Sequence, residues 1–412
     1  MAMNRVTLSR ACVQPLAALL LASCLPARVT TGSSTSISIP IEVSNNLPLA
    51  RISVNGLEPA WFIVDTGAEA SVIDTEWAEK LGLGTGEEVE VSAAGGTVDA
   101  YVVPGATLTL DGATPGGAEL RDVTLVAVPL AGLAASLGRP LGGVLGSELF
   151  AQYVVEFDYA EGALRLHKPE TYRYEGAGEV LPLLIEDDTP FVRTIIERAD
   201  GQLTEAELLL DTGNSGVLAL NTPFVNRHRL LESSGPVIPL LGAALLSGSA
   251  QRYVGRVGTL RLGSVRVPEA LTMLAQDEAG DFAEGTNDGL IGGELLRRFA
   301  RVVVDYAHRR VVLEPGAEIS QPAEFDASGL SLIALGPDFR GLRVRLVLPG
   351  SPAEGAGIEP GDVLLTFDGR PVAEYDLDEL RRVLRTPGER HTITLERGGS
   401  TMEAAITTRR LI

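Results

Sequence analysis

Two side chains in one short stretch could do chemistry. Residues 208–221 read LLLDTGNSGVLALN and contain the carboxyl group of Asp211 and the hydroxyl group of Ser215. A serine nucleophile needs a histidine base, an aspartate that orients it, and backbone donors for the oxyanion. A carboxylate that works as acid or base in a pair needs a second carboxyl group close by. The two mechanisms therefore make different demands on the rest of the chain.

An internal repeat favours the carboxylate. Asp-Thr-Gly occurs twice, at Asp65 and at Asp211, each time after an apolar strand. An apolar-apolar-Gly segment follows in each copy and ends at Gly146 and at Gly292, so that 81 residues separate the aspartate from this glycine both times. Similar strand pairs come next, YVVEFDYAEGALRLHKP and ARVVVDYAHRRVVLEPG. One unit is therefore present twice, offset by 146 residues.

This arrangement resembles the pepsin-like and retroviral-type aspartic proteases, in which each lobe supplies one Asp-Thr-Gly and one apolar-apolar-Gly segment. The resemblance covers residues 37–320 and implies a mostly β protein whose two lobes form one cleft. It also implies that Asp65 and Asp211 share one proton, so that one activates a water and the other protonates the scissile carbonyl. The sequence alone does not say which aspartate is the acid.

The same resemblance assigns supporting roles to the residues around the two aspartates. The threonines would hydrogen-bond across the lobe interface, and the glycines would allow tight turns and close approach of the backbone. Ala68 and Asn214 stand where pepsins have Ser or Thr, so we expect activity to peak in mild acid or nearer neutrality. The predicted supporting residues are Thr66, Gly67, Gly146, Thr212, Gly213 and Gly292.

The serine alternative is remote. Residues 213–216 resemble the Gly-Asn-Ser-Gly around the nucleophile of trypsin-like serine proteases. The only upstream histidine of the mature chain, His167, lies in a charged strand end, and Val217 stands where that family has a second glycine. The other histidines also look structural, and no Cys/His spacing suggests a metal site. We expect neither a metal nor a cofactor.

The C-terminal part is similar to PDZ domains. Residues 346–372 read LVLPGSPAEGAGIEPGDVLLTFDGRPV, and the following DLDELRRVL has leucines at helical spacing, which predicts the helix that lines a peptide groove. Such domains add an extended peptide to a sheet edge and hold its terminal carboxylate with backbone amides. The resemblance covers residues 325–412. The predicted peptide-binding residues are Gly329, Leu330, Ser331 and Leu332.

The N-terminus reads as an export signal. Arg5 and Arg10 precede an apolar run over 11–22 that is too short to span a bilayer. The run ends in Leu-Ala-Ser-Cys24, which resembles the lipobox of bacterial lipoproteins; the alternative is an ordinary cleaved signal peptide. Acylation of Cys24 would place the protein on the periplasmic side as an outer-membrane lipoprotein.

Composition limits the possible partners. The 412 residues carry 34 basic against 54 acidic side chains, and this net charge of −20 argues against nucleic acid. With 46 glycines, 24 prolines and 5% aromatic residues, the chain favours short strands and tight turns. Because one chain holds both repeats, we expect a monomer. The expected partners are a peptide or protein substrate, a PDZ ligand with a free C-terminus or extended segment, and a membrane reached through the lipid.

The complete prediction is an exported, lipid-anchored aspartic endopeptidase with a PDZ domain, and the alternative is a catalytically silent bilobal peptide-binding or scaffolding lipoprotein. Gly-Gly in residues 93–105 predicts a flap hairpin, with a counterpart in residues 240–255. The predicted domains are a signal peptide (1–23), a tether (24–36), protease lobe 1 (37–178), protease lobe 2 (179–320) and the PDZ domain (325–412).

Overall fold

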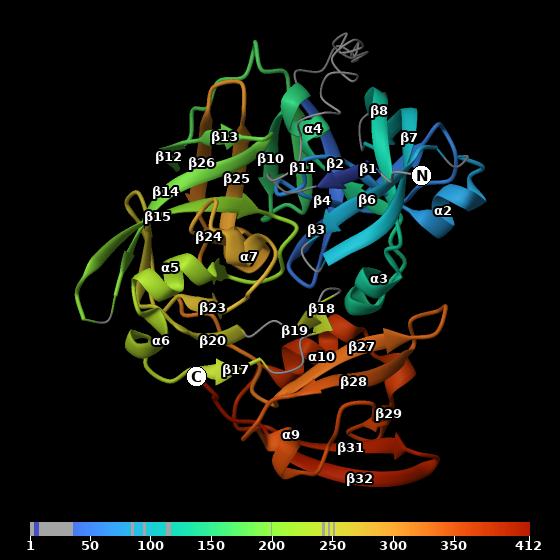
Figure 1. Ribbon diagram of the computed structural model, residues 1–412, viewed down its shortest axis with the longest axis vertical. Coiled ribbons are helices and arrows are strands. Elements are labelled where there is room, and N and C mark those ends of the chain that lie inside the picture. Colours follow the sequence, from blue (N-terminus) through green and yellow to red (C-terminus); the bar gives the residue numbers. More distant parts are fainter. Residues whose placement is uncertain are drawn as a thin grey trace.

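The computed structural model is mostly β, as predicted, and has three parts (Figure 1). Two lobes built from the repeats lie side by side, and the C-terminal domain lies against both. Cys24 and most of the predicted signal segment and tether lie outside the described residues. The structure describes residues 4–7, 36–83, 86–93, 96–112, 117–198, 200–240, 244–245, 248–249 and 252–412.

The first lobe is a strongly bent set of strands with three short helices. Helix α2 begins after Asp74, whose carboxylate accepts the Trp77 N–H and so caps the helix. A strand β1 (Asn4–Thr7) runs parallel to β6. The other elements are β2 (Ser36–Ser44), β3 (Leu47–Val54), β4 (Ala60–Val64), β5 (Val72–Asp74), α2 (Thr75–Lys80), β6 (Glu88–Ala93), β7 (Gly96–Leu110), β8 (Ala118–Val128), α3 (Ala131–Leu137), β9 (Gly143–Leu145), α4 (Ser147–Gln152), β10 (Val154–Asp158) and β11 (Ala163–His167).

The second lobe repeats this order with changes in its loops. Asn221 caps helix α5 in the place that Asp74 occupies in the first lobe. The elements are β12 (Glu179–Pro182), β13 (Leu184–Glu186), β14 (Thr189–Glu197), β15 (Leu203–Asp211), β16 (Leu218–Leu220), α5 (Thr222–Arg227), α6 (Leu230–Ser233), β17 (Ile238–Pro239), β18 (Ala244–Leu245), β19 (Gly248–Ser249), β20 (Arg252–Arg256), β21 (Thr259–Leu262), β22 (Val265–Val267), β23 (Leu271–Ala275), α7 (Asp281–Glu284), β24 (Gly289–Gly292), α8 (Gly293–Leu296), β25 (Phe299–Asp305) and β26 (Arg310–Pro315).

The C-terminal domain is a sheet in the order β27-β28-β29-β31-β32, with β30 paired to β29 and two helices. Its apolar residues form a hydrophobic cluster of their own, to which Leu377, Leu380 and Leu384 contribute from one face of α10. Asp376 caps α10 by accepting the Asp378 N–H. The elements are β27 (Leu330–Leu335), β28 (Gly341–Val347), α9 (Pro352–Gly355), β29 (Val363–Phe367), β30 (Arg370–Pro371), the 3₁₀ turn η1 (Val372–Glu374), α10 (Leu377–Leu384), β31 (Arg390–Arg397) and β32 (Ser400–Thr407).

The two lobes share a sheet. Strand β10 of the first lobe pairs antiparallel with β25 of the second, and β11 and β26 flank this pair. The second repeat has one residue more than the first between its apolar-apolar-Gly and the end of this strand, and β25 accommodates it as a bulge between Phe299 and Arg301. Because this sheet is continuous, the lobes are joined by backbone hydrogen bonds.

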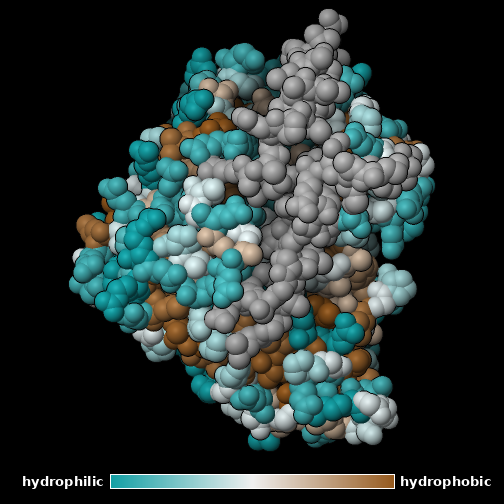
Figure 2. All heavy atoms as spheres, in the orientation of Figure 1, coloured by the Kyte–Doolittle hydropathy of each residue, from teal (hydrophilic) through white to brown (hydrophobic). Residues whose placement is uncertain are grey.

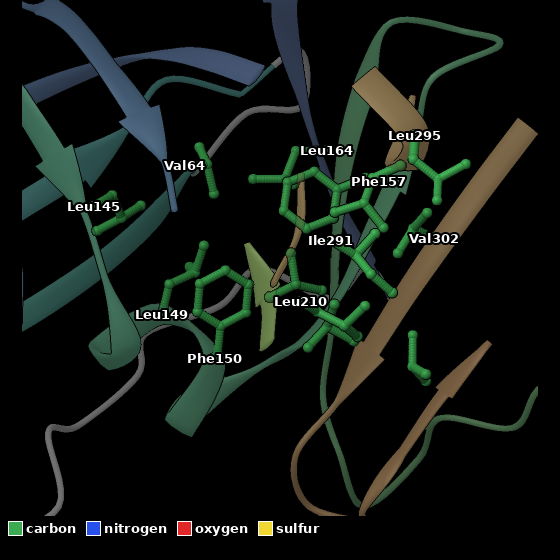
Figure 3. Packing of buried hydrophobic residues seen from close by; sticks show 14 of the residues in the cluster. Val64, Leu145, Leu149, Phe150, Phe157, Leu164, Leu210, Ile291, Leu295 and Val302 are labelled. Atoms are coloured by element: carbon green, nitrogen blue, oxygen red, sulfur yellow. The ribbon is translucent and has the colours of Figure 1, made fainter. Parts of the chain in front are cut away.

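Apolar residues of both repeats meet beside this sheet. Val64, Leu145 and Phe150 from the first lobe belong to the same buried cluster as Leu210 and Ile291 from the second (Figure 3). Val64 and Leu210 stand immediately before the two aspartates, so the strands that carry the aspartates are anchored in this core. The core therefore fixes where each Asp-Thr-Gly loop begins.

The outer surface is polar over large areas. Hydrophilic residues spread over much of the described surface that Figure 2 shows, in keeping with the excess of acidic residues. Within the described part of the chain, no helix has both the length and the apolar character needed to cross a membrane.

Candidate active site

The two Asp-Thr-Gly loops begin at equivalent points of the lobes. Strand β4 leads to Asp65 and runs parallel to β9, and β15 ends at Asp211 and runs parallel to β24. The Asp65 N–H donates to the Leu145 carbonyl (2.9 Å), so the chain enters the loop as an extension of the sheet. Each apolar-apolar-Gly segment is thus the strand on which an aspartate loop rests.

Thr66 and Thr212 join the loops by a reciprocal set of hydrogen bonds. The Thr66 hydroxyl donates to the Leu210 carbonyl (2.5 Å) and accepts from the Thr212 N–H (3.0 Å). The Thr212 hydroxyl donates to the Val64 carbonyl (2.7 Å) and accepts from the Thr66 N–H (3.0 Å). Both threonines are buried, so each of these groups depends on a partner in the other lobe.

The two carboxyl groups face one another across this contact. Gly67 N–H donates to Asp65 Oδ1 (2.7 Å), and Gly213 N–H donates to Asp211 Oδ1 (2.9 Å). A Cβ atom on Gly67 would lie 2.9 Å from the Asp211 Cγ atom, and one on Gly213 would overlap the Asp65 carboxylate. Each glycine therefore lies directly against the aspartate of the other lobe, where a side chain has no room.

Both aspartates hold protons more tightly than an ordinary carboxyl group. Burial raises the pKa of Asp65, and hydrogen bonds from Gly67 and Asp211 only partly offset it. Burial and then the nearby charge of Asp65 raise the pKa of Asp211 well above its usual range. Both residues nevertheless keep some solvent exposure. The pair therefore retains a proton where isolated aspartates would be ionised.

Gly146 and Gly292 lie directly against the backbone of the segments that follow the two Asp-Thr-Gly motifs. A Cβ atom on Gly146 would lie 2.7 Å from the Ala68 carbonyl oxygen, and one on Gly292 would overlap the Gly216 carbonyl. The residue after each of these glycines fixes the aspartate loop by a hydrogen bond, since the N–H groups of Ser147 and Gly293 donate to carbonyls of the two loops.

A glutamate follows two residues after each of these glycines, half-buried in the first lobe and buried in the second, and the sequence analysis did not identify it. In the first lobe Glu148 accepts from the Ser71 hydroxyl (2.6 Å) and N–H (3.1 Å), and burial raises its pKa. Val217 replaces Ser71 in the second repeat, and Glu294 instead contacts Asn46, Arg298 and Arg385. The sequence feature that could have identified these glutamates is their equivalent position in the two repeats, since Glu148 and Glu294 are 146 residues apart.

The structure brings no histidine to Ser215 within the described residues. The Ser215 carbonyl accepts from the Asn46 side chain (2.8 Å). His167 pairs with Glu156, and His308 pairs with Asp305. His391 pairs with Asp368, and the ring of His228 lies against Phe224. Among the described residues, no group of three or more His, Cys, Asp or Glu could hold a metal ion.

Hairpins occur at both predicted flap positions. Strands β6 and β7 pair antiparallel up to Ala93 and Gly96, and the two residues between them lie outside the described part. In the second lobe, β18 and β19 pair Ala244 with Ser249. The two lobes therefore both carry a hairpin where a flap was expected.

Of the four predicted peptide-binding residues, Gly329 lies just before the edge strand β27, and Leu330, Ser331 and Leu332 form its beginning. Leu330 and Leu332 point into the core, so the groups that they can offer a peptide are those of the backbone. Gly329 turns the chain with φ 83° just before β27, and Ser331 is half-buried. Among the described strands, β27 pairs only with β28, and it also contacts α10; this open strand edge and this helix are the two walls expected of a groove.

An internal carboxylate occupies the loop before β27. Asp326 Oδ1 accepts from the Ser328 N–H (3.0 Å) and from the Gly329 N–H (2.5 Å). Burial raises the pKa of Asp326 to about 6. A peptide carboxylate that used these amides would have to replace the Asp326 carboxylate.

The first lobe touches both walls of this groove. Helix α3 contacts β27, and a Cβ atom on Gly138, just after α3, would lie 3.0 Å from the Leu377 Cβ atom of α10. Arg381 on α10 donates to the Ser136 carbonyl (2.5 Å). On the same helix, Asp378 accepts from the Ser44 hydroxyl (2.7 Å). The C-terminal domain is thus held against the first lobe by polar and apolar contacts.

Comparisons with known protein families match two parts of the chain, one in the first lobe and one in the C-terminal domain. Residues 50–149 match the family model of aspartyl proteases, and residues 343–397 match that of PDZ domains. The predicted resemblance to these families is therefore confirmed for these segments. The chain is protease-like and carries a PDZ domain, which is a peptide-binding module.

Curated relatives with similar sequences are named proteases, and two of the three described below are named after other catalytic types. The protease Do-like 14 of Arabidopsis thaliana is 45% identical over 60 residues, 14% of each chain. A zinc metalloprotease of Neisseria meningitidis is 26% identical over 228 residues, 52% of this chain and 48% of the relative. The serine protease HhoA of Synechocystis is 36% identical over 77 residues, 18% of this chain and 19% of the relative. The chain spans less than half the length of each of these relatives.

Solved structures match over about a fifth of the chain. The HtrA3 PDZ domain bound to a phage-derived ligand is 24% identical and covers 21% of this chain and 86% of its own, with a TM-score of 0.19. The photosystem II D1 C-terminal processing protease is 26% identical and covers 21% of this chain and 24% of its own, with a TM-score of 0.20.

Replacing Thr212 with valine should destabilise the contact between the loops. Valine keeps the shape of the side chain but leaves the Thr66 N–H and the Val64 carbonyl unpaired in a buried place. Each such group costs about 1–3 kcal/mol, so we expect a loss of about 2–6 kcal/mol in the free energy of unfolding. Thr212→Ser keeps the hydroxyl and should cost only about 0.8 kcal/mol for the lost methyl group. Urea unfolding measures both, and equal losses would contradict a role for the hydroxyl.

Removing one carboxyl group of the pair should stabilise the fold as the pH rises. The pKa of Asp211 is raised in the folded protein above the ordinary value of about 3.9. Below that pH, Asp211 is protonated in both the folded and the unfolded protein. Above it, Asp211 ionises more readily in the unfolded protein, so the wild type loses folding stability as the pH rises. Asp211→Asn should therefore gain stability over the wild type from about pH 4 upward.

Asp158→Asn is the matched control, because the pKa of Asp158 is shifted in the opposite direction and the change in stability with pH should therefore be reversed. Burial alone would raise the pKa of Asp158, but the hydrogen bond and charge of Arg165 lower it below the usual range. Asp158→Asn should thus be less stable than the wild type at pH 7, and this difference should shrink in acid as the wild type loses the ion pair. Urea unfolding between pH 3.5 and 7.5 tests both, and parallel pH curves for wild type and variants would refute the two assignments.

Proposed function

We propose that this protein is an aspartic endopeptidase in which Asp65 and Asp211 share one proton and activate a water molecule. The observation that carries the proposal is that each carboxyl group lies against the Asp-Thr-Gly glycine of the other lobe, so that the two groups interact and both have a raised pKa. The Asp-Thr-Gly repeat supplies both groups from equivalent strands. A peptide carbonyl beside the pair would meet one group able to accept a proton and one able to donate it.

In this mechanism no covalent intermediate forms. The ionised carboxylate takes a proton from water, which attacks the scissile carbonyl, while the protonated carboxyl group donates its proton to the carbonyl oxygen. The N–H groups of Gly67 and Gly213 keep each carboxylate oriented toward the other. The backbone N–H groups of Ala68 and Asn214 lower the pKa values of Asp65 and Asp211. Ala68 has no side-chain hydroxyl, however, and the Asn214 side-chain oxygen accepts from the Gly216 N–H, so neither side chain supplies the hydroxyl donor that pepsins have at this place. Activity is expected to peak in mild acid or nearer neutrality.

The location and the partners belong to the same proposal. An export signal followed by acylation of Cys24 would place the enzyme on the periplasmic side of the outer membrane, with residues 24–36 as a tether. The PDZ domain would bind peptide or protein termini, so its ligands would be substrates or regulators of the protease lobes.

Substitution of either aspartate should abolish peptide hydrolysis. We expect Asp65→Asn and Asp211→Asn each to lower kcat by about a thousandfold or more, because acid and base act as a unit. Ser215→Ala should keep most of the activity. The assay is cleavage of a peptide library by the purified mature chain, with and without pepstatin. A dead Ser215→Ala variant beside an active Asp211→Asn variant would overturn the dyad. A wild type that binds peptides without cleaving them would favour the silent scaffold.

Replacing Cys24 with serine should release the protein from the membrane. Two or three acyl chains bind a bilayer strongly, since each buried methylene contributes about 0.8 kcal/mol. Cys24→Ser should therefore move a folded, active chain to the soluble periplasmic fraction. Cell fractionation and mass spectrometry of the mature N-terminus test this. An unmodified wild-type N-terminus at another residue would remove the anchor and leave the peptidase proposal unaffected.

A further inference from the structure

A cavity of about 350 Å³ lies where helix α10 of the PDZ domain meets the lobes. The lobes contribute the turn between β2 and β3, Tyr159 and Arg297 to its wall. The PDZ domain contributes one face of α10, because residues 378, 381, 382 and 385 follow each other at helical spacing. Both halves are therefore needed to form this interdomain cavity.

The wall of the interdomain cavity is positively charged, although the whole chain carries a net charge of −20. Four guanidinium groups line it against the single carboxylate of Asp378. This carboxylate pairs with Arg381 (2.9 Å). The lining guanidinium groups are those of Arg297, Arg381, Arg382 and Arg385.

Two of these four charges have no anionic partner among the described residues. Arg297 donates to the neutral side chain of Asn46 (2.6 Å). Arg382 is exposed and has neither an ion pair nor a side-chain hydrogen bond within the described part of the chain. Arg385 reaches Glu294 at 3.4 Å, but Glu294 also lies 3.6 Å from Arg298. The cavity thus has more positive charge than its own carboxylates balance.

The nearby positive charges affect the pKa of Arg381. Burial lowers the pKa of Arg381, the pair with Asp378 opposes this, and the neighbouring Arg385 lowers it further. An anion in the cavity would relieve this repulsion and would accept hydrogen bonds from several guanidinium groups.

The interdomain cavity is also linked to the second aspartate loop. Asn46 accepts from Arg297 through its oxygen and donates through its amide to the Ser215 carbonyl (2.8 Å), four residues after Asp211. The same amide also reaches Glu294 at 3.3 Å. A ligand that fixes Arg297 would therefore restrain Asn46 and, through it, the aspartate loop.

We propose that the interdomain cavity binds a phosphate-bearing anion that joins the PDZ domain to the protease lobes. Guanidinium groups present paired N–H donors that match the oxygens of phosphate. Arg297 and Arg382, the two lining guanidinium groups that have no anionic partner among the described residues, could together balance a dianion. The phosphate group comes either from free phosphate or from a lipid headgroup, which the experiment separates.

Titration calorimetry of the full mature chain with inorganic phosphate at constant ionic strength tests the proposal. Binding at one site per chain is expected, and Arg382→Gln and Arg297→Gln should each weaken it at least tenfold. Arg390→Gln is the charge-matched control: Arg390 is exposed on β31 and does not line the cavity, so its loss should change the affinity less than twofold. Because Arg382 makes no ion pair or side-chain hydrogen bond with the residues that the structure describes, Arg382→Gln should melt at the wild-type temperature in chloride buffer, which excludes misfolding.

The second arm uses vesicles of phosphatidylcholine with and without phosphatidylglycerol. Binding of free phosphate that depends on Arg382 supports a soluble anion. Binding only to phosphatidylglycerol vesicles, again dependent on Arg382, supports a lipid headgroup. Absence of both, or an equal loss in the Arg390→Gln control, overturns the proposal. None of these measurements uses peptide cleavage, so the result stands whether or not the peptidase proposal holds.

Discussion

The reciprocal hydrogen bonds between Thr66 and Thr212 are the constraint on which the rest of the site depends. Each hydroxyl ties its own loop to the backbone of the other lobe, in a buried place where water cannot substitute. This contact brings together two carboxyl groups that would repel each other if both were ionised. The stability of the shared sheet and of the apolar core is therefore used to hold an electrostatically unfavourable pair in place.

The repeat is not a perfect copy, and one substitution has a structural consequence. Ser71 holds Glu148 inside the first lobe, whereas Val217 at the equivalent place cannot hydrogen-bond Glu294. Glu294 turns instead to arginines, one of which, Arg385, belongs to the PDZ domain. Loss of a single hydroxyl group thus leaves the second lobe with a carboxylate that contacts the PDZ domain, in addition to the contacts that the first lobe makes with the same helix.

The sequence predicted what depends on local patterns. Asp65 and Asp211 were predicted as the candidate pair because apolar strands, Asp-Thr-Gly and a common interval recur, and α10 was predicted because its leucines follow helical spacing. The partners of Asp378 could not be predicted, since Ser44 lies 334 residues away and no local pattern links them. The buried side chains of Leu330 and Leu332 and the Asp326 carboxylate before them also depend on tertiary packing.

The contact of helix α3 with both walls of the PDZ groove makes α3 a tethered competitor. A peptide that adds a strand to β27 must displace a helix of the same chain, whose effective concentration does not fall on dilution. Its apparent dissociation constant is the intrinsic one divided by the fraction of molecules in which α3 has moved away. Weak ligands would then leave the groove closed, and only tight or abundant ones would cross this threshold and free the PDZ domain from the first lobe.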